Sequence, residues 1–119
     1  MAVVWHIDDD DIQLELVSLI LQNVHPQGQI VSFGDAQRAL EQMRTHGLPD
    51  ILVLDLNMPL VNGWDVLQEM ARRKVEVPTW ILTSSIDPRD RTRANSFLSV
   101  KGFLIKPLNA IAATAIFAT

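Results

Sequence analysis

The stretch Ile51-Leu52-Val53-Leu54-Asp55 decides the fold of this chain. Its four apolar residues do not alternate with polar ones, which is typical of a central parallel strand covered by helices on both faces. Asp55 follows at once, and a loop with Pro59 and Gly63 leads to a segment of helical periodicity from about Trp64 to Arg73. The stretch therefore predicts a βα unit that carries a carboxylate at the end of its strand.

Similar units are expected on both sides of this one. Further strand-like runs occupy residues 3–7, 29–33, 79–83 and 103–105. Helix-start residues follow several of them, namely Asp35, Asp87-Pro88 and Pro107 with Asn109. Repeated βα units with right-handed crossovers predict a doubly wound α/β fold. We expect a five-stranded parallel sheet in the flavodoxin-like order 2-1-3-4-5, with helices on both faces.

Composition restricts the class of protein. The chain has 119 residues, 48% of them apolar, and no linker-like stretch, so a single domain is expected over residues 1–119. The formal net charge of −4 argues against broad binding to nucleic acid or to an anionic membrane. There is no cysteine, no signal-peptide pattern and no apolar run of the ~20 residues that span a bilayer. We therefore expect a soluble, cytoplasmic protein.

Four of the five apolar runs end in polar side chains that carry chemistry. These side chains are Asp8 and Asp9, Asp55, Thr83 and Lys106. The carboxyl ends of parallel strands meet at one edge of the sheet, where ligands bind. Three carboxylates, a hydroxyl and an ammonium group are therefore expected to lie together.

This group of side chains suits a metal ion and a phosphoryl group. Two carboxylates ~4 Å apart repel by about 4 kcal/mol at an effective dielectric constant near 20, and a hard cation relieves that repulsion. Oxygen ligands without cysteine favour Mg²⁺ over Zn²⁺. Lys106 would supply positive charge and Thr83 a donor for a phosphoryl group. Asp55, at the end of the central strand, is the best candidate for a carboxylate nucleophile.

The ordered set of motifs resembles the receiver domains of two-component response regulators, of the chemotaxis-regulator type. The residues that carry the resemblance are Ile7-Asp8-Asp9, Asp55-Leu56-Asn57-Met58-Pro59 with Asn62-Gly63, Thr83-Ser84 and Lys106-Pro107. The resemblance covers nearly the whole chain, and the motifs occur in the family's order.

The resemblance implies a role for each residue of the site. Asp55 would accept a phosphoryl group from a histidine kinase or a histidine phosphotransfer protein. Mg²⁺, which Mn²⁺ can replace, would be held by Asp9 directly and Asp8 through water, with Asp55 and the backbone carbonyl of Asn57 as further ligands. The residues implied to bind the phosphoryl group or to switch with it are Thr83, Ser84, Lys106 and Phe103, and Pro107 is expected to follow a cis peptide bond.

The resemblance also implies an output. Phosphorylation would remodel the face formed by helix four, strand five and helix five, to which a downstream protein would bind. We expect no enzyme activity beyond self-catalysed phosphorylation and dephosphorylation. The last helix is apolar nearly all round, from Ile111 to Ala118, so it should expose apolar surface and could form a homodimer contact.

Other interpretations of these residues remain. Asp10 and Asp11 are explained by capping of the first helix. His6, inside an apolar strand, is expected to be a core residue that points away from Asp9, not a metal ligand. An aspartyl-nucleophile phosphatase of the haloacid-dehalogenase type would need a second acid where Asn57 stands. A receiver-like scaffold that is never phosphorylated would have no need of the complete set of site residues.

Overall fold

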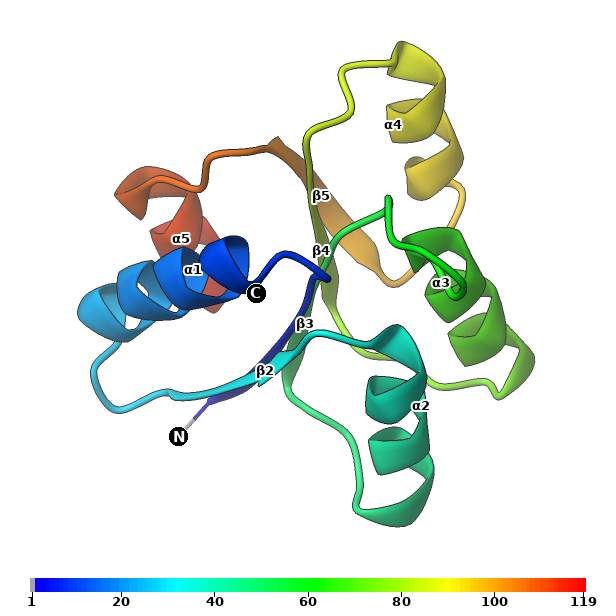
Figure 1. Ribbon diagram of the computed structural model, residues 1–119, viewed down its shortest axis with the longest axis horizontal. Coiled ribbons are helices and arrows are strands. Elements are labelled where there is room, and N and C mark those ends of the chain that lie inside the picture. Colours follow the sequence, from blue (N-terminus) through cyan, green and yellow to red (C-terminus); the bar gives the residue numbers. More distant parts are fainter. Residues whose placement is uncertain (1) are drawn as a thin grey trace.

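The computed structural model describes residues 2–119 as one five-stranded parallel sheet between two layers of helices (Figure 1). The strands are β1 Val3–Ile7, β2 Gln29–Phe33, β3 Ile51–Leu54, β4 Thr79–Thr83 and β5 Val100–Ile105. The helices are α1 Asp11–Val24, α2 Ala36–Thr45, α3 Gly63–Arg72, α4 Pro88–Asn95 and α5 Ala110–Phe117. The strand order is β2-β1-β3-β4-β5 with every pair parallel, which confirms the predicted doubly wound fold.

Two boundaries differ from those that the sequence predicts. β5 begins at Val100 instead of residue 103, and its pairing with β4 shifts by one residue between Thr79 and Trp80. Gly102 therefore lies inside this strand. Glycine is needed there because the Cβ of any other residue would stand 2.3 Å from the ring of Trp80. α3 begins at Gly63, one residue early, because Asn62 caps it in a reciprocal capping box with Asp65.

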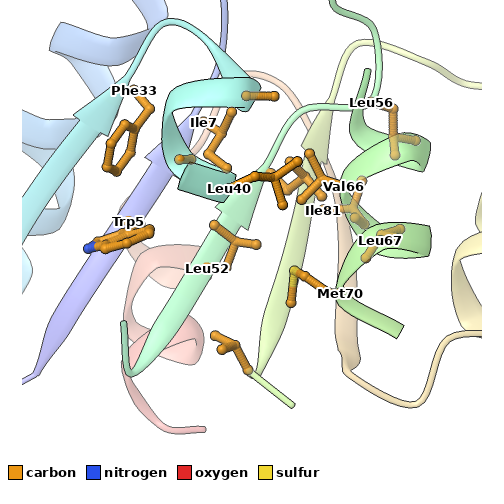
Figure 2. Close-up of a cluster of buried hydrophobic side chains, with 14 of the residues drawn as sticks. Trp5, Ile7, Phe33, Leu40, Leu52, Leu56, Val66, Leu67, Met70 and Ile81 are labelled. Atoms are coloured by element: carbon orange, nitrogen blue, oxygen red, sulfur yellow. The ribbon is translucent and has the colours of Figure 1, made fainter. Parts of the chain in front are cut away.

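The two faces of the sheet are covered by different helices. α1 and α5 lie on one face, and α2, α3 and α4 lie on the other (Figure 1). The larger buried cluster fills the space between the sheet and α2 and α3, where Trp5, Ile7 and Leu52 from the strands meet Leu40 and Met70 from the helices (Figure 2). Along β1, residues alternate between this cluster and a smaller one beneath α1 and α5, as strand geometry requires.

The strand order places two carboxylate-bearing strand ends side by side. β1 and β3 are neighbours, with Ile7 paired to Leu54, and the amide of Asp55 donates to the carbonyl of Ile7 at 3.0 Å. Asp8 and Asp55 therefore leave the sheet at the same level. Within residues 2–119, no helix has the length and apolar character that crossing a bilayer requires.

Candidate functional site

Three aspartates converge at the carboxyl edge of the sheet. Asp8 and Asp9 follow β1, Asp55 follows β3, and one carboxylate oxygen from each lies within 4.8 Å of the others. Asp8 is fully buried and Asp55 is 3% exposed, whereas Asp9 is exposed to solvent. The cluster is thus buried at Asp8 and Asp55 and open to solvent at Asp9, where a ligand can enter.

Backbone amides orient the two buried carboxylates. The Asp10 amide donates to Asp8 Oδ1 at 2.9 Å, and the Asn57 amide donates to Asp55 Oδ1 at 3.4 Å. The Asp10 side chain has a separate task, because its Oδ1 accepts from the amide of Ile12 at 2.9 Å and caps α1. Asp10 therefore acts as the cap that the sequence indicates, while Asp8 and Asp55 keep their remaining oxygens for other partners.

Lys106, which follows β5, supplies the positive charge of the cluster. Its Nζ lies 2.7 Å from Asp8 Oδ2 and 3.3 Å from Asp55 Oδ2, and its side chain is only 14% exposed. Burial lowers the pKa of Lys106, but pairing with Asp8 and the charge of Asp55 outweigh it, so the pKa is raised overall. The ammonium group therefore stays charged and is shared by both buried carboxylates.

One ammonium group does not balance three carboxylates. Burial, followed by the charge of Asp8, raises the pKa of Asp55, and Lys106 only partly opposes this shift. Burial alone would raise this pKa, but the part of the shift that Asp8 causes reflects negative charge that Lys106 does not fully neutralise. The donors gathered here are carboxylate oxygens, which hard divalent cations such as Mg²⁺ prefer. The residues present thus fit the cation that the sequence implies.

Thr83 and Lys106 are tied together through the backbone. The Lys106 amide donates to the carbonyl of Thr83 at 2.8 Å, so the ends of β4 and β5 stay in register. Thr83 is fully buried, and its Oγ1 accepts from the amide of Ser85 at 3.3 Å, whereas Ser84 is exposed. The peptide bond between Lys106 and Pro107 is cis.

Phe103 lies apart from the carboxylates. It is buried in β5, and the guanidinium group of Arg91 from α4 stands 4.9 Å from the centre of its ring. Arg93, also on α4, stands 4.2 Å from the ring centre of Trp64 in α3. A run of arginines on a helix usually indicates a solvated face, but these two side chains make further contacts. Both are exposed, yet each covers an aromatic ring.

Sequence reasoning also missed the position of His6 relative to the site. The ring is fully buried, as expected for a core residue, and it does not belong to the group of side chains that could share a metal ion. Its Nε2 lies 4.0 Å from Asp8 Oδ2. The two-residue period of a strand, applied from residue 6 to residue 8, places His6 on the same side as Asp8 and could have revealed this.

Comparisons with known proteins identify the family and the fold of the chain. The family model described as the response regulator receiver domain matches residues 4–117. A two component response regulator from Cytophaga hutchinsonii has a crystal structure that superimposes with a TM-score of 0.86 at 30% identity, covering 98% of this chain and 93% of that one. The chemotaxis protein CheY4 of Vibrio cholerae superimposes with a TM-score of 0.84 over 99% of this chain and 97% of its own, and at 22% identity it shows the fold alone.

Curated relatives are similar over different lengths. The probable methanogenesis regulatory protein FilR2 of Methanothrix harundinacea is 31% identical over 114 residues, which are 90% of this chain and 73% of the relative. The response regulator SaeR of Staphylococcus aureus is 38% identical over 60 residues, which are 50% of this chain and 26% of SaeR. With the receiver model matched across nearly every described residue, the chain belongs to the response regulator receiver domain family.

Proposed function

We propose that this chain is a phosphoacceptor signalling domain in which Asp55 receives a phosphoryl group from a phosphohistidine of a histidine kinase or a histidine phosphotransfer protein. The observation that carries the proposal is the contact of one partly buried ammonium, that of Lys106, with both Asp8 and Asp55 beside an exposed Asp9. This arrangement offers a nucleophile, a cation site and a cationic partner for phosphoryl oxygens within one small space.

The transfer is a substitution at phosphorus. A carboxylate oxygen of Asp55 forms a bond to phosphorus while the bond from phosphorus to the donor's histidine nitrogen breaks, leaving an acyl phosphate and a neutral donor histidine. Mg²⁺ held by Asp8, Asp9, Asp55 and the Asn57 carbonyl would neutralise charge on the phosphoryl oxygens. The Lys106 ammonium, already 3.3 Å from Asp55 Oδ2, would stabilise the same oxygens from another side.

The output of the switch would pass through β4, β5 and α4. Thr83 is joined to Lys106 by a backbone hydrogen bond, so an ammonium group drawn toward a phosphoryl group pulls on the end of β4 as well. Phe103 and Ile105 of β5 lie, with Arg91, around a pocket of about 200 Å³ between β5 and the start of α4. A change in these contacts would alter the face formed by α4, β5 and α5, to which a downstream protein would bind.

A hydrolytic enzyme is the less well supported alternative. A phosphatase with an aspartyl nucleophile needs a second group that exchanges a proton, and the residue two positions after Asp55 is the exposed amide Asn57. The described residues place no further acid beside Asp55 other than Asp8 and Asp9, which the cation site would use.

Mass spectrometry after incubation with acetyl phosphate tests the proposal. The chain should gain the mass of one phosphoryl group in the presence of Mg²⁺ and much less in its absence, and peptide mapping should place the group on Asp55. Asp55→Asn should abolish the modification. Asp50→Asn is the matched control, because Asp50 accepts from the Val3 amide at the other end of β3, a task that an asparagine oxygen can also perform. Labelling that survives in Asp55→Asn would overturn the proposal.

A further inference from the structure

His6 is a buried polar side chain without a partner. It is the second-to-last residue of β1, is fully buried, and neither ring nitrogen has a hydrogen-bond partner among residues 2–119. Buried polar groups in folded proteins are almost always hydrogen-bonded, because leaving one unpaired costs free energy. An orphaned histidine in the core beneath a reactive site therefore calls for a functional explanation.

The Asp8 carboxylate lies close to the ring but outside hydrogen-bond distance. His6 Nε2 lies 4.0 Å from Asp8 Oδ2, and both side chains are fully buried. The other oxygen of Asp8 is occupied by the Asp10 amide. Asp8 Oδ2 is held by the Lys106 ammonium at 2.7 Å, and the described residues place no further donor on it. Donor and acceptor thus face each other across a gap that is about 1 Å longer than an N–H···O hydrogen bond.

The ring is suited to donate, and it is not placed to bind the cation itself. Burial, together with the charge of Lys106, lowers the pKa of His6 to about 3, so the imidazole is neutral and carries one N–H. The group of oxygens that can share a metal ion comprises Asp8, Asp9 and Asp55 without His6. Any influence of His6 on the site must therefore act through Asp8.

We propose that His6 is a positioning residue for Asp8, whose Nε2–H donates to Asp8 Oδ2 when Lys106 leaves that oxygen for a phosphoryl group on Asp55. Lys106 now contacts both carboxylates, and a doubly charged phosphoryl group draws the ammonium toward Asp55. Asp8 would then be a buried carboxylate with one free oxygen, which is unfavourable unless a donor replaces the ammonium. His6 is the neighbouring donor, and a shift of about 1 Å completes the hydrogen bond.

Nitrogen NMR of the histidine ring tests the donor directly. The inference rests on the proposed function, because phosphorylation of Asp55 is what moves Lys106 away from Asp8. The contact between His6 and Asp8 can nevertheless be examined without any phosphoryl group. In the wild-type chain the ring should be the tautomer protonated at Nε2. In Lys106→Met, which removes the competing ammonium, this proton should become hydrogen-bonded and exchange slowly with water. A ring protonated at Nδ1 in the wild-type chain would overturn the proposal, whether or not Asp55 is ever phosphorylated.

Binding of beryllofluoride, a mimic of the acyl phosphate, tests the consequence. With Mg²⁺ present, the wild-type chain should bind beryllofluoride, and the same slowly exchanging Nε2 proton should appear. His6→Leu should bind about tenfold more weakly, as expected for loss of one hydrogen bond to a charged group. His6→Gln, which keeps a donor near the position of Nε2, should recover part of the affinity. If His6 had a purely structural role, each variant would lose beryllofluoride affinity in parallel with its loss of thermal stability. His6→Gln would then recover no affinity.

The outcomes separate the two proposals. If the wild-type chain does not bind beryllofluoride, the proposed function fails, and the ring signals of Lys106→Met still decide the role of His6. If the wild-type chain binds it and His6→Leu binds equally well in folded form, the positioning role is wrong while the proposed function stands. If His6→Leu does not fold, the wild-type chain decides the question. A ring protonated at Nε2 whose proton becomes slowly exchanging with beryllofluoride supports the positioning role, and the absence of either result overturns it.

Discussion

Helices α3 and α4 differ sharply in how they are attached to the same face of the sheet. Each follows a strand that ends at the site, each starts with a side-chain cap, and the two lie next to each other (Figure 1). α3 buries four residues against the sheet, namely Gly63, Val66, Leu67 and Met70. In α4, Ala94 is the only buried residue among the eight that form the helix.

The difference corresponds to two tasks. The backbone of α3 holds the segment that follows β3 and Asp55, because the Gly63 amide donates to the Leu56 carbonyl at 3.0 Å. α4 is held largely by surface contacts, in which Arg91 covers Phe103 and Arg93 covers Trp64. A helix with few buried contacts moves at a low cost in free energy. We therefore expect α3 to keep Asp55 in place and α4 to carry the change that a partner detects.

Truncation of the buried side chains should show the largest difference between the two helices. Met70→Ala removes a side chain that is 1% exposed, and it should lower the free energy of unfolding by about 2–5 kcal/mol. Ala94→Gly, the corresponding change in α4, should cost about 1 kcal/mol, mostly from helix propensity. Urea unfolding followed by circular dichroism measures both. Equal losses would mean that α4 is as firmly anchored as α3.

Crowding the start of α3 should disturb Asp55, the proposed phosphoacceptor. A Cβ at residue 63 would lie 2.3 Å from the Asp55 carbonyl oxygen and 2.7 Å from the Leu56 Cα, so Gly63→Ala must displace the backbone. We expect a loss of about 1–3 kcal/mol in stability, together with slower labelling of Asp55 by acetyl phosphate. Gly34→Ala is the matched control, because its Cβ would meet nothing closer than a Leu14 methyl group at 3.8 Å. Normal labelling in Gly63→Ala would show that α3 does not hold Asp55.

The attachment of α3 could be predicted from the sequence better than that of α4. The periodic apolar residues between Trp64 and Arg73, with Asn62 and Gly63 before them, predict a helix with one buried side, and the structure confirms it within one residue. The start of α4 is equally clear from Asp87-Pro88. The loose packing of α4 could not be predicted. The charged residues 89–93 give the same sequence pattern whether or not the arginines cover aromatic rings.

The site shows the same division. Asp8, Asp55 and Lys106 could be predicted to meet because each ends a strand, and topology alone fixes where strand ends lie. The orphaned ring of His6 could not be found in this way. Whether a strand histidine has a hydrogen-bond partner depends on the side chains packed over it from other elements, which the local pattern does not specify.

Removal of single arginines on α4 should lower stability less than the changes in α3 do, and it should show the contribution of each cation–π contact separately. Arg91→Ala and Arg93→Ala should each cost about 0.5–1 kcal/mol, the usual worth of an exposed cation–π contact. Arg93→Ala should also change the fluorescence of Trp64, which the guanidinium group covers. Arg89→Ala is the control, since Arg89 forms an ion pair with the Asp87 side chain and, among residues 2–119, covers no aromatic ring. In Arg91→Ala and Arg93→Ala, amide hydrogen exchange should become faster in α4 and not in α3. Equally faster exchange in both helices would contradict the view that α4 is the less firmly held of the two.

Acid should loosen the start of α4 before that of α3. The Asp87 side chain accepts from the Arg89 amide at 2.9 Å, and its bonds to the Arg89 side chain and amide lower its pKa below the usual 3.8. A carboxyl with a lowered pKa stabilises the fold above the unfolded value, and that stabilisation is lost as the pH falls through the folded value. In α3 the amide of Asp65 donates to the side-chain oxygen of Asn62, an acceptor that has no proton to gain. Below pH 3.8, amide exchange at Arg89 should therefore rise more than at Asp65. Asp87→Asn should cap equally well and remove this pH dependence, and if it does not, the acid response of α4 arises outside its cap.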